Sequence, residues 1–440
     1  MSLSLEAGLR PLTEITCDAP AGRPAEQLSV GIVGMGYVGL PTALSFLDAG
    51  FSVIGLDVSE ARLGAIRDQS VDLLPRDGFR LGHHLESTNL TLSANPKSLR
   101  NARAIIVCVP TPVDSNLVPD LGPLRSACRA VVENAVPGQL IVLTSTTYVG
   151  CTRDFVVEPL RERGFIPGVD VHVVFSPERI DPGVAHHRPE ETPRVVGGHT
   201  SECTRRAMGL LEPTCRNLHA VRSLESAEMT KLLENTFRAV NIALINEFAD
   251  SSRALGVDIA EVIDAAATKP YGFMKFMPGP GVGGHCIPCD PHYLLWQLRS
   301  LHHDAPVTDA AMRAIAHRPS VVTARVTETL AELGVAMASA RVHVVGVAFK
   351  AGVADLRESP ALEILEWLDR HNVRVSYTDA HVPALRLRGR MLHSVDRAPD
   401  GTDLILVLTL HSDADLEWLE QSVPALDASF RASGRNIRRV

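Results

Sequence analysis

One glycine-rich stretch near the middle of the chain has the residue types of a nucleophilic site. It runs from Pro278 to Pro291 and reads Pro-Gly-Pro-Gly-Val-Gly-Gly-His-Cys-Ile-Pro-Cys-Asp-Pro. Glycine permits positive φ and close approach of the backbone to a ligand, at an entropic cost that a plain surface loop need not bear. Cys286 follows the glycines, and Asp290 stands four residues later. A thiol near an acid is a candidate nucleophile; the alternative is a connector with two incidental thiols.

The cysteine pattern favours neither a metal site nor a disulfide framework. The eight cysteines are scattered, and Cys286 and Cys289 form the one Cys-x-x-Cys. A structural zinc site needs two further ligands at matching spacing. The first 27 residues have neither the apolar core nor the cleavage pattern of a signal peptide. We therefore expect a loose N-terminal arm over residues 1–27 and free thiols in a reducing cytosol.

Composition limits the class of protein. A chain of 440 residues is long enough for two or three domains, and 45% apolar with 21% charged residues is typical of a globular fold. The net charge of −8 argues against a nucleic-acid partner, which a basic face usually binds. No apolar run approaches the roughly eighteen residues of a membrane span. A cytoplasmic protein without membrane or nucleic-acid partner is expected.

A second motif predicts a dinucleotide site. An apolar run over residues 28–33 leads into Gly-Met-Gly-Tyr-Val-Gly, then a helix-like segment over 40–49 and a second strand over 51–56 that ends at Asp57. Glycines between strand and helix let a pyrophosphate approach the helix N-terminus. Asp57 would bind both ribose hydroxyls and repel a 2′-phosphate, which favours NAD over NADP. The alternative is a Gly-rich turn without a ligand. The predicted NAD-binding residues are Gly34, Gly36, Tyr37, Val38, Gly39, Asp57, Thr111, Ser145 and Thr146.

Further strands place polar residues beside this cofactor site. Runs over residues 104–109, 140–144 and 171–175 read as buried strands, and ligands in such sheets bind outside the carboxyl ends of the strands. Thr111 follows the first run, and Ser145 and Thr146 follow the second. Glu178 follows the third and is expected to face the same crevice, although a lone loop acid is more often simply solvated.

A long helix is predicted over residues 223–255 from apolar residues at helical spacing. Lys231 and Asn235 are four residues apart and share one of its faces. Spacing alone favours two solvated side chains there. A helix of this length between two α/β halves also suits contact between domains and dimerisation. Helical residues 257–267 and 310–333 follow, with Pro319 predicted to break or restart the second.

A second α/β unit ends the chain. Strands are predicted over residues 342–345, 373–377 and 404–408, and Ser359-Pro360 opens a helix. The fold class is therefore α/β, with two Rossmann-like doubly wound domains joined by a long central helix. The expected division is an arm at 1–27, an NAD-binding domain at 28–215, a central helical domain with the catalytic loop at 216–305, a helical linker at 306–335 and a UDP-sugar-binding domain at 336–440.

Together these motifs resemble the nucleotide-sugar 6-dehydrogenase family, which includes UDP-glucose, GDP-mannose and UDP-N-acetylhexosamine dehydrogenases. The resemblance covers residues from about 29 to about 412 and follows the family's order of motifs. It is carried by Gly34–Gly39 with Asp57, Ser145-Thr146, Pro177-Glu178, Lys231 with Asn235, Gly283-Gly284-His285-Cys286 with Asp290, and Phe349-Lys350 with Arg357-Glu358-Ser359-Pro360.

Within the family, two stretches are similar to the UDP-N-acetylglucosamine dehydrogenase branch. These are residues 268–288, Thr-Lys-Pro-Tyr-Gly-Phe through Pro-Gly-Pro-Gly to Cys-Ile-Pro, and residues 176–183, Ser-Pro-Glu-Arg-Ile-Asp-Pro-Gly. UDP-N-acetylmannosamine and UDP-glucose remain alternative substrates. A non-catalytic NAD- and nucleotide-sugar-binding protein is a further alternative, and a two-electron hydroxy-acid dehydrogenase is disfavoured because it needs neither the thiol nor the second domain.

The resemblance implies oxidation of a primary alcohol to a carboxylate with two NAD⁺ in succession. Cys286 would add to the aldehyde as a thiolate and give a thiohemiacetal, then a thioester that water hydrolyses. Lys231 and Asn235 would stabilise the developing oxyanions. Asp290, through a water shared with Thr146, would serve as the base, and Glu178 is the other candidate base for hydrolysis.

On the substrate side, the resemblance implies that Lys350 and Arg357 suit the UDP diphosphate. Gly283 and Gly284, together with Glu178 and Lys231, complete the expected substrate-binding residues. The helix over residues 223–255 resembles the family's dimer interface, so a homodimer or higher homo-oligomer is expected.

The chain departs from the family pattern at four positions. Thr144 and Val149 stand where glutamate and proline are common, and Pro182 replaces a second glutamate. Cys289 stands where the family usually has no cysteine. One helical turn would separate it from Cys286, which suggests a reversible Cys286–Cys289 disulfide as a hypothesis.

Overall fold

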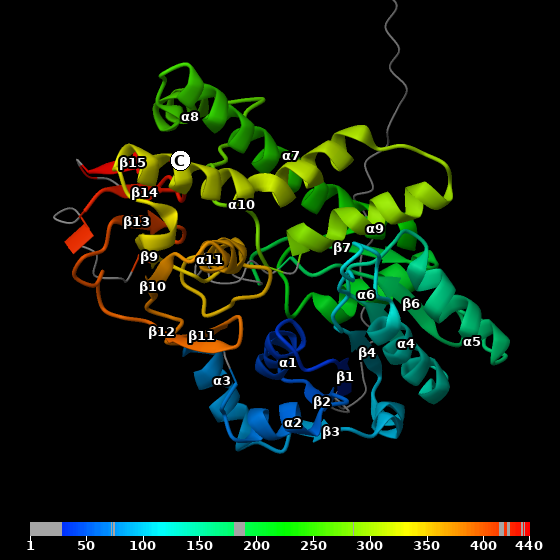
Figure 1. The fold of residues 1–440 in the computed structure, drawn as a ribbon. Helices are drawn as coiled ribbons and strands as arrows, with labels where there is room; N and C mark the ends of the chain where they lie inside the picture. Colours follow the sequence, from blue (N-terminus) through cyan, green and yellow to red (C-terminus); the bar gives the residue numbers. More distant parts are fainter. Residues whose placement is uncertain are drawn as a thin grey trace, which may run out of the picture.

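The computed structural model describes residues 29–71, 73, 75–179, 190–284, 286–412, 418–419, 423–432, 434 and 436–440. The expected arm at 1–27, residues 180–183 of the Ser-Pro-Glu-Arg stretch and His285 of the cysteine loop lie outside this part. Figure 1 shows two α/β units with long helices between them.

The N-terminal unit is built on an eight-stranded sheet of order β3-β2-β1-β4-β5-β6-β7-β8. Every neighbouring pair is parallel except β6 and β7. The strand order reverses between β1 and β4, so the loops after these two strands diverge and leave the position where doubly wound sheets bind ligands. The strands are β1 Ser29–Val33, β2 Ser52–Leu56, β3 Leu90–Ser93, β4 Ala104–Val107, β5 Leu140–Leu143, β6 His172–Phe175, β7 Arg194–Gly198 and β8 Leu218–Val221.

Helices cover both faces of this sheet, which is why its central strands are continuous apolar runs. Side chains of α1, α2, α3 and α6 pack in one layer, and those of α4, η2 and α5 pack in the other. The bounds are α1 Gly39–Asp48, α2 Glu60–Arg67, α3 Pro75–Leu85, η1 Pro96–Asn101, α4 Gly122–Asn134, η2 Arg153–Val157, α5 Glu158–Glu162 and α6 Ser201–Leu211. The predicted strands are present, with ends shifted by one or two residues, whereas β3, β7 and β8 were not predicted. All three are short, and β7 ends in two glycines.

Four helices separate the two units along the described chain: α7 Leu224–Ala254, α8 Ile259–Ala267, α9 Cys286–Ser300 and α10 Pro306–Glu332. The Ser223 hydroxyl caps α7 by accepting a hydrogen bond from the Ser226 N–H at 3.1 Å. The prediction of a break at Pro319 is wrong, because α10 runs through it. An interior proline loses one helix hydrogen bond, but apolar residues of α10 on both sides of it are buried, and this packing maintains the helix.

The C-terminal unit repeats the architecture on a smaller scale, as predicted. Its parallel sheet has the order β10-β9-β13-β14-β15, and a hairpin of β11 and β12 lies beside it. The bounds are η3 Met337–Ser339, β9 Arg341–Val345, α11 Pro360–Arg370, β10 Arg374–Thr378, β11 Ala384–Leu387, β12 Arg390–His393, β13 Leu404–Val407, β14 Ala425–Asp427 and β15 Ile437–Arg439.

The first turns of the two units share one equivalent backbone hydrogen bond. Gly34 N–H donates to the β2 carbonyl of Leu56 at 2.8 Å, and Gly346 N–H donates to the β10 carbonyl of Thr378 at 2.8 Å. Both glycines have positive φ, of +90° and +79°. The C-terminal unit is thus a Rossmann-like domain that keeps the turn but lacks the full glycine fingerprint.

Candidate active site

The turn between β1 and α1 has the backbone geometry that a dinucleotide pyrophosphate requires. A Cβ on Gly39 would lie 1.8 Å from the Gly34 carbonyl oxygen, so only glycine fits there. A Cβ on Gly36, in contrast, would meet no atom within 4 Å. This open space lies at the start of α1, where unpaired helix N–H groups favour an anion. The turn therefore fits NAD.

Asp57 follows β2 and directs its carboxylate to the same turn. Its two oxygens accept hydrogen bonds from the Met35 N–H at 2.8 Å and the Ser59 N–H at 2.9 Å. These amides orient the carboxylate and leave lone pairs for two ribose hydroxyls. Val38 is the residue before α1, and the neighbouring Tyr37 side chain is exposed.

The remaining predicted cofactor residues lie at the same edge of the sheet. Thr111 follows β4 and is buried, and Ser145 follows β5 and donates from its hydroxyl to the Val109 carbonyl at 2.8 Å. Because β1, β2, β4 and β5 are parallel neighbours, their carboxyl ends meet at one edge. The tertiary structure thus brings the predicted NAD-binding residues together.

Two helices bring the predicted catalytic residues into one cluster. Lys231 and Asn235 lie one turn apart on α7, and Cys286 and Asp290 lie one turn apart on α9. The Asn235 amide donates to the Asp290 carboxylate, which joins the two helices. Lys231 and Asn235 are each only 9% exposed, so the interpretation as solvated surface residues is wrong.

The surroundings of Asp290 tune its pKa. The side chain is 2% exposed, and this burial raises its pKa from 3.8 to about 6. Lys231 and the hydrogen bonds from Asn235 and Thr146 oppose the rise. Thr146 thus lies close enough to Asp290 to lower its pKa. At neutral pH Asp290 is ionised and able to accept a proton.

Cys286 is the first residue of α9, and its side chain is exposed, whereas the other described cysteines are buried. Surrounding protein atoms nevertheless displace much of the water around its thiol. This desolvation and the Asp290 carboxylate raise the pKa of Cys286 to about 11, although Lys231, Arg357 and Arg238 oppose the rise. The thiol is therefore protonated at neutral pH and needs a proton acceptor to react.

Glu178 reaches the cluster through its backbone. Its carbonyl accepts a hydrogen bond from the Lys231 ammonium at 2.9 Å and so fixes that side chain. Its carboxylate lies 3.3 Å from the Arg194 guanidinium and accepts from the Arg179 N–H at 2.9 Å. The candidate second base is thus held in an ion pair in this structure.

The glycines before Cys286 pack against the C-terminal unit. A Cβ on Gly283 would lie 2.6 Å from Phe349 Cβ, and one on Gly284 would lie 2.8 Å from the Phe349 ring. The Gly284 N–H donates to the Arg357 carbonyl at 3.0 Å. These contacts explain why glycine is required at both positions.

The two predicted substrate-side cations, Lys350 and Arg357, lie on the segment between β9 and α11 that forms these contacts. The Arg357 guanidinium bonds the Asp355 carboxylate and also stacks over the Tyr37 ring, with 5.2 Å to its centroid. Tyr37 belongs to the dinucleotide turn, so Arg357 connects that turn with the segment that is predicted to bind substrate.

Sequence reasoning missed two residues that hold the segment after β5. Glu228 on α7 is 1% exposed and accepts from the Gly150 N–H at 2.6 Å and the Thr152 N–H at 2.9 Å. Gln297 on α9 bonds both backbone groups of Val149, at 3.0 and 2.7 Å. The spacing 228, 231, 235 along one helical face was the signal that could have found Glu228.

Cys289 lies one turn beyond Cys286, but it is buried, and this burial raises the pKa of its thiol to about 12. Both cysteines are free thiols in the structure. Among the described residues no group of three or more His, Cys, Asp or Glu side chains could hold a metal ion. No helix in the described ranges is long and apolar enough to cross a membrane.

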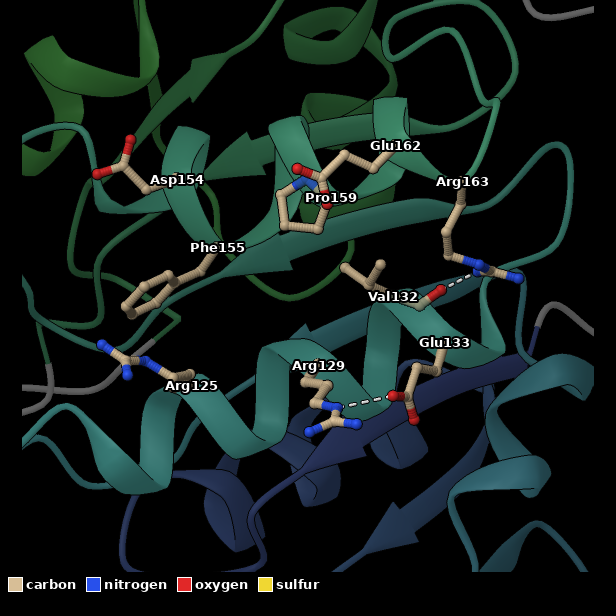
Figure 2. Close-up of a pocket in the computed structure, with 9 residues that line it drawn as sticks. All are labelled: Arg125, Arg129, Val132, Glu133, Asp154, Phe155, Pro159, Glu162 and Arg163. Atoms are coloured by element: carbon tan, nitrogen blue, oxygen red, sulfur yellow. Dashed lines mark hydrogen bonds and ion pairs between the residues drawn. The ribbon is translucent and has the colours of Figure 1, made fainter.

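A pocket of about 340 Å³ lies away from this cluster, between α4 and the η2–α5 segment (Figure 2). Arg125 stacks over the Phe155 ring there, Arg129 pairs with Glu133, and Arg163 donates to a backbone carbonyl. None of the predicted site residues lines it.

Comparisons with known proteins agree with this arrangement. Three segments match the UDP-glucose/GDP-mannose dehydrogenase family: residues 28–214 its NAD binding domain, 225–315 its central domain and 343–438 its UDP binding domain. The chain is 33% identical to UDP-N-acetyl-D-glucosamine 6-dehydrogenase of Pseudomonas aeruginosa, over 88% of this chain and 92% of that protein. It is 35% identical to protein CapL of Staphylococcus aureus, over 80% and 82% of the two chains.

A solved structure is similar over nearly the whole length. UDP-N-acetyl-D-mannosamine dehydrogenase of Pyrococcus horikoshii has a TM-score of 0.85 at 30% identity, covering 94% of this chain and 99% of that one. The fold and the NAD-binding domain agree with these matches. The chain belongs to the UDP-glucose/GDP-mannose dehydrogenase family and is an NAD-dependent nucleotide-sugar dehydrogenase.

Proposed function

We propose that this enzyme oxidises the 6-hydroxyl of a UDP-N-acetylhexosamine, UDP-N-acetylglucosamine in the first place, to the carboxylate. The observation that carries the proposal is the meeting of Cys286 and Asp290 on α9 with Lys231 and Asn235 on α7. A protein that only binds NAD and nucleotide sugar has no need of a nucleophile beside an oxyanion site. UDP-N-acetylmannosamine and UDP-glucose are the alternative substrates.

NAD supplies the two-electron acceptor of each of the two oxidations. In the first, Asp290 takes the proton of the 6-hydroxyl, and the Lys231 ammonium stabilises the negative charge that develops on that oxygen. The product of this step is the aldehyde.

The second oxidation depends on Cys286. Asp290 first releases the proton from the first oxidation to solvent. Because burial and Asp290 raise the pKa of the Cys286 thiol to about 11, this thiol then adds to the aldehyde as its proton passes to Asp290, one turn away on α9. The resulting thiohemiacetal has a C–H bond to lose, and its oxidation gives a thioester. Water then cleaves the C–S bond, which yields the carboxylate and restores the thiol. One sugar, two NAD⁺ and one water give one carboxylate, two NADH and three protons.

Substrate binding is assigned to the C-terminal unit. We place the diphosphate near Lys350 and Arg357, where cations suit its charge. We retain the division into an NAD-binding domain at 28–215, a central domain at 216–305, a helical linker at 306–335 and a UDP-sugar domain at 336–440, which the matched family segments support.

We also propose a homodimer through α7. Large apolar side chains form an exposed stripe along this helix: Met229, Leu233, Phe237, Leu244 and Phe248. Such a stripe is typical of an interface. Light scattering at micromolar concentration should give twice the chain mass, and Leu233→Glu should reduce it; a wild-type monomer would contradict the proposal.

The test of function is NADH formed per sugar consumed, with UDP-N-acetylglucosamine, UDP-N-acetylmannosamine and UDP-glucose side by side. Two NADH per sugar with UDP-N-acetylglucosamine preferred supports the proposal. One NADH per sugar would refute the role of the thiol in a second oxidation. No NADH with any of the three would refute the substrate class.

A further inference from the structure

Arg318 in the middle of α10 is 2% exposed and holds a backbone position in the loop that precedes Cys286. Its Nη1 donates to both carboxylate oxygens of Asp250 on α7, at 2.7 and 2.9 Å. Its Nε donates to the Gly279 carbonyl at 3.0 Å. On the other side, the Asn246 side-chain oxygen accepts from the Gly279 N–H at 2.9 Å. Both backbone polar groups of Gly279 are therefore fixed, by two different helices.

The loop is then fixed a second time where it passes the C-terminal unit. Gly281 has φ +148°, and a Cβ there would lie 2.8 Å from Pro360 Cβ at the start of α11. Gly284 donates to the Arg357 carbonyl at 3.0 Å. Cys286 follows as the first residue of α9. The loop thus has one fixed point on α7 and α10 and another beside the substrate-side segment.

The ion pair between Arg318 and Asp250 contributes little to the free energy of unfolding, although Arg318 is buried. Arg318 Nη2 is buried without a hydrogen-bond partner among the described residues, and an unsatisfied buried donor is unfavourable. Asp250 is 36% exposed, which screens the attraction. Buried ion pairs can often be replaced by apolar residues without loss of stability. The distinct effect of Arg318 is the fixed position of Gly279.

We propose that Arg318 is a positioning residue for Cys286, which acts by holding Gly279 together with Asn246 and Asp250. The inference rests on the proposed function of Cys286 as the nucleophile. The first oxidation does not use the thiol, whereas the second requires it within bonding distance of the aldehyde carbon. Loosening the loop therefore affects the second oxidation more than the first.

The test uses the double variant Arg318→Met/Asp250→Leu, which removes both charges and keeps the interior apolar. We expect NADH per sugar to fall from two toward one, with free aldehyde trapped by semicarbazide, and the KM for sugar to stay within about twofold. A purely structural role would lower the thermal midpoint and all activities together. Asn246→Ala, which removes only the acceptor for the Gly279 N–H, should shift the stoichiometry in the same direction if the double variant does not fold.

Arg325→Met is the matched control, since Arg325 is also on α10 but pairs with Glu328 of the same helix. An unchanged stoichiometry in the Arg318 and Asn246 variants, or an equal loss in the control, would overturn the proposal.

A second readout is independent of turnover. In a Cys17→Ser background, iodoacetamide should modify the exposed Cys286 selectively, because the other described cysteines are buried. We expect the rate of Cys286 modification to change at least threefold in Arg318→Met/Asp250→Leu and to stay unchanged in the control Arg325→Met. If wild-type enzyme oxidises no UDP-sugar, the proposed function fails. The rate of Cys286 modification still decides whether Arg318 positions the thiol, because an unchanged rate in the Arg318 variant refutes that role.

Discussion

Replacing Asp290 by asparagine should abolish activity and yet stabilise the protein at neutral pH. Asparagine keeps the size of the side chain and can still accept the hydrogen bond from Asn235, but it cannot take a proton or carry charge. The Asp290 carboxylate, which we propose as the catalytic base, is buried, and burial raises its pKa from 3.8 to about 6.

The magnitude follows from that rise. It corresponds to about 3 kcal/mol in favour of the protonated form in the folded protein. This contribution is fully present below pH 4, the unfolded pKa, and is lost as the pH rises through about 6. Asp290→Asn has no carboxyl group to ionise, so it does not lose this stability as the pH rises. Its thermal midpoint relative to wild type should therefore increase between pH 4 and pH 7, by about 3 °C if all 440 residues unfold together.

Two measurements test this reasoning. Thermal midpoints of wild type and Asp290→Asn at half-unit steps from pH 4 to pH 8 should diverge as the pH rises, while Asp68→Asn, at an exposed carboxylate on the end of α2, should run parallel to wild type. The kcat of Asp290→Asn should fall about 10²- to 10⁴-fold, and wild-type kcat/KM should drop about tenfold per unit below pH 6. Parallel midpoint curves for wild type and Asp290→Asn would refute the buried-charge argument. Near wild-type turnover of Asp290→Asn would refute the assignment of Asp290 as the base.

Three further predictions concern the thiol and the cofactor. Cys286→Ser should lower carboxylate formation about 10³-fold or more, because an alkoxide adduct is a poorer acyl carrier; carboxylate quantified by mass spectrometry at the wild-type rate would exclude the nucleophile role. Asp57→Ala should raise the Kd for NAD about 10- to 100-fold, because charge-assisted hydrogen bonds to ribose are lost; calorimetry with unchanged affinity would contradict that role. Gly36→Ala should weaken NAD binding without lowering the thermal midpoint, since its Cβ meets open space, whereas Gly39→Ala should lower the midpoint, because its Cβ would lie 1.8 Å from a carbonyl oxygen. If both glycine variants changed NAD affinity and thermal midpoint alike, Gly36 would not be specific to NAD binding and Gly39 would not be specific to stability.

The dinucleotide turn could be predicted from the sequence because its information is local. Gly34, Gly36 and Gly39 are constrained by one strand, one turn and one helix, and Asp57 follows the next strand. Helical spacing likewise placed Lys231 and Asn235 on one face of α7. It could not say whether that face was buried, since spacing alone does not reveal what packs against a helix. Pro319 was mispredicted for the same reason: propensity argues for a break, and packing on both sides maintains the helix.

By itself, then, the sequence determined the two Rossmann-like units and the cofactor, and it singled out Cys286 as the candidate nucleophile, since each depends on residue type at short spacing. The tertiary structure alone decided what surrounds them. Asp290 acquires its raised pKa from burial against α7, and Arg318 reaches Gly279 only because α10 packs across the cysteine loop. These contacts join residues that are far apart in the chain. Such residues form a site only when tertiary packing brings their side chains together.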